Sequence, residues 1–259
     1  GISSCAYSTF QPAEAGSSYD FSCTSGSSCQ QVSMELASHS GKCTGAGACK
    51  GASISSELEP SFAGPSQLLC SAAGACSNAK ISLPLQALSC SGTSACAEAQ
   101  VEARAADEGK LAVTCGPSVS ACSNMTLSSF EKRKTGMLQC SGARTCADLS
   151  WTTRVVGGML FNCTGSDACA RSALINNGSA ILRCGQGSCE GLTLDVTCGS
   201  TVNCQGLQSC KGITLRAPEK CGNGKCYLNA EDADLSDAKL VGDWECIRVS
   251  PEAVCPTNF

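Results

Sequence analysis

One short phrase recurs along the chain, and its spacing constrains the fold more than any other feature. The clearest copy is LQCSGARTCADLSW at residues 138–151, in which Cys140 and Cys146 flank a Ser-Gly turn. Related phrases recur between residues 21 and 226, and successive first cysteines are 20 to 27 residues apart. A short period of this kind is typical of a solenoid, in which each repeat forms one turn of chain and stacks on its neighbours.

Apolar residues keep a constant register to the cysteines. The residue five after the second cysteine is apolar in all eight copies: Met34, Ile54, Ile81, Val101, Leu127, Trp151, Leu174 and Leu194. The residues three after the second cysteine and two before the first are apolar with two exceptions, Ser172 and Gly41. Steps of two are the period of a β-strand. Each repeat is therefore predicted to be a strand, a cysteine, a Gly/Ser corner, a second cysteine, a strand and a variable connection.

The chain has 24 cysteines in 259 residues, a density that predicts a disulfide framework in an oxidising compartment. Each pair could close its own corner, or cysteines could bridge neighbouring coils, because stacked strands lie ~4.8 Å apart and suit either geometry. The variable Cys184/Cys189 and Cys115/Cys122 spacings favour closure within the corner. The predicted pairs are Cys23–Cys29, Cys43–Cys49, Cys70–Cys76, Cys90–Cys96, Cys115–Cys122, Cys140–Cys146, Cys163–Cys169, Cys184–Cys189, Cys221–Cys226 and Cys246–Cys255. Cys198, Cys204 and Cys210 follow at steps of six and suggest a tighter turn of the same coil.

These features predict an all-β fold, a single parallel β-helix of about nine to ten coils with disulfide staples and a cap at each end. Residues 1–22 are expected to form the N-terminal cap, 23–226 the β-helix, and the acidic segment 227–259 a C-terminal cap that could hold a short helix. The chain resembles cysteine-rich parallel β-helix repeat proteins over about residues 20–226. That resemblance concerns architecture, and it implies no particular partner or oligomeric state.

Composition restricts the location and the partners. A net charge of −4 provides no basic field for nonspecific nucleic-acid binding. No apolar run approaches the ~18 residues of a membrane span. Three N-x-S/T sequons, at Asn124, Asn162 and Asn177, add support for secretion or another oxidising lumen. In a secreted protein, Gly1 would be a processed N-terminus. The strand period places Asn124 and Asn162 on the outer surface.

The sequence favours a protein that is not an enzyme and holds no cofactor or metal. His39 is the one histidine, and the cysteine spacing matches neither a zinc site nor a Cys-x-x-Cys redox motif. Carbohydrate-active enzymes with a β-helix architecture are the enzymatic alternative, and they would need clustered carboxylates. The acidic and basic residues considered for such a cluster are assigned to the variable connections: Glu57, Glu59, Glu102, Asp107, Glu108, Glu131, Arg104, Arg133 and Arg154.

The variable connections are the best candidates for function. Segments 55–66, 102–110, 128–136 and 152–158 occupy equivalent points of their repeats, and such inserts map to one side of a solenoid. Lys132, Arg133, Lys134 and Arg154 form a candidate docking loop for another protein or a glycan. The expected function is a structural or interaction module of a secreted, cell-surface or matrix assembly. The alternatives are an accessory subunit of a larger complex in an oxidising lumen and a carbohydrate-active enzyme or lectin.

Overall fold

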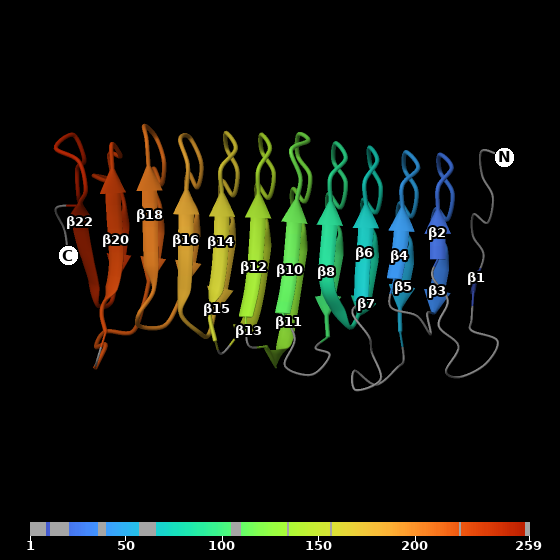
Figure 1. The fold of residues 1–259 in the computed structure, drawn as a ribbon, viewed down its shortest axis with the longest axis horizontal. Coiled ribbons are helices and arrows are strands. Elements are labelled where there is room, and N and C mark those ends of the chain that lie inside the picture. The colour runs from blue at the N-terminus through green and yellow to red at the C-terminus, as the bar shows by residue number, and fades with distance from the viewer. Residues whose placement is uncertain are drawn as a thin grey trace.

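The computed structural model describes residues 9–10, 21–35, 40–56, 66–104, 110–133, 135–155, 157–222 and 224–256. It confirms a parallel β-solenoid, in which two sheets of 11 strands each run the length of the molecule (Figure 1). The described strands form ten coils with one strand in each sheet, β2/β3 to β20/β21, and β1 and β22 are additional single strands, so the count is close to the nine to ten coils predicted.

Successive strands alternate between the two sheets, so that each coil contributes one strand to each. The first sheet contains β1 (Thr9–Phe10), β3 (Ser33–Glu35), β5 (Ser53–Ser55), β7 (Lys80–Leu83), β9 (Gln100–Ala103), β11 (Thr126–Arg133), β13 (Ser150–Val155), β15 (Ala173–Asn176), β17 (Thr193–Asp195), β19 (Thr214–Arg216) and β21 (Lys239–Val241). The second sheet contains β2 (Phe21–Cys23), β4 (Ser40–Cys43), β6 (Ser66–Cys70), β8 (Leu85–Cys90), β10 (Lys110–Cys115), β12 (Thr135–Cys140), β14 (Met159–Cys163), β16 (Ala180–Cys184), β18 (Thr201–Gln205), β20 (Cys226–Glu231) and β22 (Trp244–Arg248).

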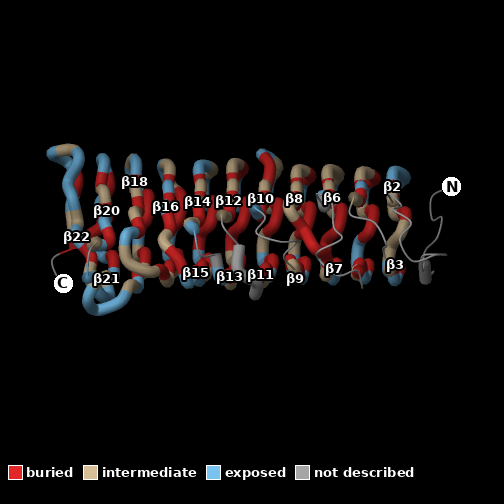
Figure 2. The backbone as a smooth tube through the Cα atoms, turned by 60° about the horizontal axis from the view of Figure 1, so that its bottom comes forward, coloured by how far each residue is buried: buried red, intermediate tan, exposed pale blue. Residues whose placement is uncertain are grey.

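The core lies between the two sheets and is built from columns of like residues. Along most strands, buried residues alternate with intermediate or exposed ones, as the red, tan and blue segments of Figure 2 show. Leu127, Trp151 and Leu174 pair directly across β11, β13 and β15 and are all buried. From the second sheet, Phe161 meets Trp151 edge to face with ring centroids 5.8 Å apart. The predicted inward register is therefore confirmed.

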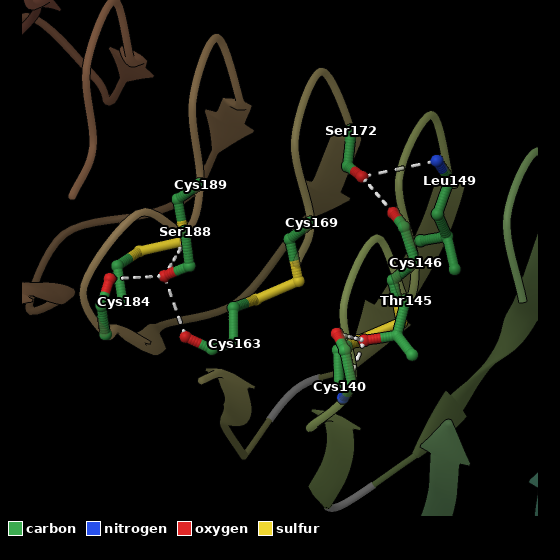
Figure 3. Close-up of a disulfide and its surroundings, with 12 residues drawn as sticks. Cys140, Thr145, Cys146, Leu149, Cys163, Cys169, Ser172, Cys184, Ser188 and Cys189 are labelled. Carbon is green, nitrogen blue, oxygen red and sulfur yellow. Dashed lines mark hydrogen bonds between the residues drawn. A yellow bond between two sulfur atoms is a disulfide. The ribbon is translucent and has the colours of Figure 1, made fainter. Parts of the chain in front are cut away.

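The two exceptions to the apolar register have physical explanations. Gly41 pairs with Phe21 of the preceding coil, and a Cβ at Gly41 would lie 2.0 Å from that ring. The Phe21 ring thus occupies the space that a side chain at residue 41 would need. Ser172 is buried, but its hydroxyl donates to the Cys146 carbonyl and accepts the Leu149 N–H at 3.2 Å (Figure 3). Hydrogen bonding offsets the desolvation of this hydroxyl.

The corners form a third hydrogen-bonded stack through an unusual backbone pattern. Arg144, Cys146 and Asp148 all have left-handed φ values, of 54°, 56° and 57°. Their N–H groups alternate in direction: Cys146 donates to Ala121 of the preceding coil, whereas Arg144 and Asp148 donate to Ser166 and Ala170 of the next. The same alternation recurs in the other corners, for example around Cys96. Backbone hydrogen bonds therefore join the coils on three sides.

The glycine of the corner is required by close packing between coils. A Cβ added to Gly165 would lie 2.2 Å from the carbonyl oxygen of Gly142, and one added to Gly142 would lie 2.5 Å from the carbonyl oxygen of Pro117. The obstructing atoms are backbone atoms, which cannot rotate away. Glycine at this position is therefore a consequence of stacking.

Both sheets extend past residue 226, where the cysteine pattern ends. β20, β21 and β22 continue the two sheets, and Val254 pairs with Asp234 in the last corner. The segment expected to be a C-terminal cap thus contains further coil, and its described residues include no helix. β1 lies in the expected N-terminal cap and pairs with β3. No helix in the described ranges has the length and apolar character needed to span a bilayer.

Candidate functional site

The cysteines lie at the corners, and most of them are paired as predicted. Ten bridges close locally with Cα separations of 5.9–6.1 Å. Three of them, at Cys140, Cys163 and Cys184, are visible in Figure 3. Cys204 pairs with Cys210, which the sequence had placed in a tighter turn. This extensive pairing is consistent with an oxidising compartment.

The predicted Cys221–Cys226 bridge is wrong. Cys221 instead pairs with Cys198 of the preceding coil, with Cα atoms 5.5 Å apart, and Cys226 is a free, buried thiol. Cys226 begins β20, whereas the first cysteine of most corners ends its strand, as Cys184 ends β16. In this coil Ala230 takes the place of the first cysteine and pairs with Cys204 of the preceding coil. The register rule itself would have rejected the pair, because Glu219 precedes Cys221 by two residues and Glu231 follows Cys226 by five. Cys5 lies outside the described residues.

Cys226 is protected by its surroundings. Burial raises the pKa of its thiol, and the sulfur lies 3.4 Å from the Thr197 carbonyl oxygen. A folded-state pKa above the ordinary value lowers the thiolate fraction at neutral pH. We expect iodoacetamide to modify the Cys226 peptide at least about tenfold more slowly in the folded protein than in the denatured, unreduced protein. Peptide mass spectrometry measures both rates. Equal rates would show that Cys226 is accessible in the folded state.

The sulfur clusters of the corners are not suited to hold a metal ion. Four groups of three cysteine sulfurs lie within 4.8 Å of one another, for example Cys140, Cys146 and Cys169. All members of these groups are in disulfides. A metal is bound by thiolate sulfur, which a disulfide does not provide.

Three of the four candidate docking residues belong to strands and not to a loop. β11 extends to Arg133 and β12 begins at Thr135, so segment 128–136 is mostly strand. The backbone of Lys132 and Arg133 belongs to β11, Arg154 is an exposed residue of β13, and Arg133 pairs with Val155. Lys134 lies outside the described residues. The structure therefore places Arg133 and Arg154 near the C-terminal ends of two adjacent strands, β11 and β13.

The three sequons are accessible to different degrees. Asn124 is exposed in a corner and Asn177 is exposed just after β15. Asn162 is half-buried on β14 between the buried residues Phe161 and Cys163, so its side chain is on the outer face.

A polar groove lies on the outer face of the first sheet. It has a volume of about 450 Å³ and runs across β5, β7, β9 and β11. Its lining includes Ile54, Ile81 and Val101 and the polar residues Ser53, Ser55, Lys80, Ser82, Gln100, Glu102, Thr126 and Ser128. Ser82 donates to Glu102 at 3.2 Å. This groove was not predicted from the sequence, although its polar residues occur at the fourth and sixth positions after each second cysteine.

Carboxylates are sparse in the described lining of the groove. Glu102 is the one carboxylate among the described residues that line it, whereas glycoside hydrolysis ordinarily uses two. Glu102 was expected to lie in a loop, but it belongs to strand β9. Arg104 donates to the carbonyl oxygens of Ser56 and Ser82, so it joins neighbouring coils. The other acidic candidates, Glu57, Glu59, Asp107 and Glu108, and His39 lie outside the described residues, and Glu131 is described only by its backbone.

Several exposed charges away from the groove are paired between coils. Arg171 forms two hydrogen bonds with Asp148, at 2.8 and 2.7 Å, and holds the pKa of that carboxyl below its ordinary value. Arg216 lies 3.4 Å from Asp195, and Lys225 lies 3.3 Å from Glu245. Exposed pairs of this kind contribute little to stability. They do reduce the charge that these residues offer to a partner.

No family model matches the chain, and neither a curated protein nor a solved structure matches it.

Proposed function

We propose that the protein is a structural or interaction module of a secreted, cell-surface or matrix assembly, and that it is not an enzyme. The observation that carries this proposal is the in-register stack, in which nearly every corner is closed by a disulfide. A stack joined on three sides is a rigid rod that presents equivalent positions at a spacing of ~4.8 Å. An accessory subunit in an oxidising lumen would use the same rod. Glycosylation at Asn124, Asn162 and Asn177 belongs to this proposal.

Docking is assigned to the side of the solenoid along which the strands of the first sheet end, which is named the docking edge. The connections to the second sheet leave from this edge in every coil, so their variation does not disturb the core. Arg154 is exposed there, and the backbone of Arg133 is on the adjacent strand. Lys132 and Lys134 flank Arg133 in the sequence. A local group of cations on an acidic protein selects an acidic partner, either a protein surface or a charged glycan.

The docking proposal predicts a selective effect of charge reversal. Replacing Lys132, Arg133, Lys134 and Arg154 by Glu should weaken binding to a heparin column, used as an acidic probe, by at least about tenfold. The melting temperature should stay nearly unchanged, because surface substitutions typically change stability by less than ~0.5 kcal/mol. The matched control reverses four exposed cations elsewhere on the solenoid, Lys42, Lys50, Lys211 and Lys220. Equal loss in both variants would indicate a nonspecific charge effect, and no binding by the unmodified protein would contradict the docking edge.

The polar groove favours a second candidate function, binding of an extended neutral saccharide. Its hydroxyl, amide and carboxylate groups repeat from strand to strand and offer both donors and acceptors. We expect Gln100→Ala combined with Glu102→Ala to abolish binding of an oligosaccharide that is first identified on a glycan array. Asp195→Ala is the control, because Asp195 occupies the same outward column on β17, outside the groove. If no saccharide on the array binds, or if Asp195→Ala weakens binding equally, this candidate is wrong.

A further inference from the structure

A hollow lies on the outer face of the second sheet, where β14, β16 and β18 begin. Its volume is about 330 Å³, within the ~300–1,000 Å³ that is usual for ligand pockets. Gly158, Ser179 and Gly199 line it at equivalent positions of three successive coils. A Cβ added to Gly199 would have no described atom within 4 Å. The two glycines therefore leave open a space that side chains would otherwise occupy.

One wall of the hollow is apolar. Leu160 and Ile181 pair directly across β14 and β16, and both line the hollow. Ile181 is 44% exposed and Leu160 is half-buried. Met137 continues the same outward column on β12. Adjacent exposed apolar side chains on the outer face of a sheet mark a surface that another group covers.

A glycosylation sequon adjoins the hollow. Asn177, Gly178 and Ser179 form this sequon, and Ser179 lines the hollow. Asn177 is exposed, and its backbone N–H donates to the Thr153 carbonyl at 3.4 Å. The Asn176 side chain donates to the carbonyl oxygens of Gly178 and Ser179 at 2.9 and 3.0 Å. A sugar on Asn177 would thus begin two residues from the hollow, on a turn that hydrogen bonds hold in place.

The other two sequons are placed differently. Asn162 follows Leu160 by two residues, on the side away from Gly158, and Gln139 and Arg183 flank it on the neighbouring strands. Asn124 is exposed in a disulfide corner. Asn177 is therefore the sequon asparagine that adjoins the open positions.

We infer that the first N-acetylglucosamine of a glycan on Asn177 occupies this hollow and covers Leu160 and Ile181. The C–H faces of a pyranose ring gain dispersion contacts with aliphatic side chains, and its polar groups can hydrogen-bond to the Ser179 hydroxyl. Attachment to the same chain gives the sugar a high effective concentration, so weak contacts suffice. The inference rests on the proposed glycosylation of Asn177, and it is independent of the docking edge and of the polar groove.

Enzymatic release of the glycans from the folded protein tests the inference. The full chain is produced in a glycosylating host, and glycopeptide mass spectrometry first measures the occupancy of Asn177 and Asn124. The folded, unreduced protein is then treated with peptide-N-glycosidase F, which cuts between asparagine and the first sugar. We expect release from Asn177 to be at least about tenfold slower than from Asn124, because the enzyme acts only on the fraction of glycan that has left the hollow. In the denatured, reduced protein the two rates should be equal.

A charge on the apolar wall distinguishes the hollow from other causes of slow release. Ile181→Asp keeps the sequon and should speed release from Asn177 at least about fivefold, because a carboxylate under the sugar would lose its water. Tyr227→Asp is the matched control, since Tyr227 is in the same outward column two coils further on and is 37% exposed. It should leave the rate unchanged. Circular dichroism confirms that the variants are folded, and Leu160→Ser repeats the test if Ile181→Asp is not.

The outcomes separate the inference from the proposal on which it rests. Absence of glycan at Asn177 would contradict the proposed glycosylation there, and the inference with it. A glycan on Asn177 that is released as fast in the folded protein as in the denatured one would overturn the inference alone. Slow release that persists in Ile181→Asp, or that Tyr227→Asp relieves equally, would overturn it as well, because the protection would have another source.

Discussion

Reduction of the disulfides is expected to unfold the solenoid under conditions in which the oxidised protein is stable. A bridge that closes a short loop of this kind is worth about 2 kcal/mol. Losing several together exceeds the ~5–15 kcal/mol by which domains are stable. Aromatic residues make up only 4% of the chain, so the core has little reserve. The second cysteine of a corner, such as Cys169 with φ 56°, would also lose the bond that fixes its left-handed backbone.

Far-UV circular dichroism with and without a phosphine reductant measures this effect. The graded comparison is Cys163→Ala combined with Cys169→Ala, which removes one corner bridge and should lower the free energy of unfolding by roughly 2–4 kcal/mol without loss of fold. A fully reduced protein that kept its β-spectrum and melting temperature would show that packing and hydrogen bonds alone hold the coils.

Replacement of Trp151 by alanine should cause the largest loss among single core substitutions. The Trp151 side chain is fully buried and packs edge to face on Phe161. Removing a large aromatic residue from such a site typically costs about 3–5 kcal/mol, because stacked coils cannot close the cavity. Denaturant unfolding under nonreducing conditions measures the change.

Ile175→Ala is the control for this substitution. Ile175 is on the next strand of the same sheet but faces outward and is 39% exposed. The loss of stability on Ile175→Ala should stay near or below ~1 kcal/mol, because part of this side chain already contacts water and its removal leaves no buried cavity. Similar effects of the two substitutions would contradict the inward register of β13 and β15.

The repeat pattern predicted the core because one short phrase fixes which side chains point inward. Leu127, Trp151 and Leu174 could be placed in one column from their distance to a cysteine. The Cys221–Cys226 prediction failed because it relied on cysteine spacing alone. The two cysteines have the right separation, but the residues around them do not fit the register. Both bridging schemes suit the strand spacing, so the Cys198–Cys221 link between coils needed the three-dimensional structure.

The limits of the strands and the corner backbone were harder to predict. Charged residues such as Lys132, Arg133 and Glu102 suggested loops, but the outer face of a sheet also accepts charge, and β11 and β9 include them. The left-handed residues of the corners are glycine in some coils, such as Gly47 and Gly74, but Arg144 or Glu98 in others. The hydrogen bonds from coil to coil stabilise that conformation, and they are not visible in any single repeat.

Because of the corner stack, the length of the solenoid can change only by the addition or removal of complete coils. Each coil is bonded to its two neighbours through both sheets and through its corner, as Cys146 and Arg144 illustrate. Removing or adding one complete coil joins surfaces that are already alike, and it shifts the ends by one strand spacing, ~4.8 Å. A partner that binds two distant coils would thus contact sites at a fixed separation, which the number of intervening coils determines.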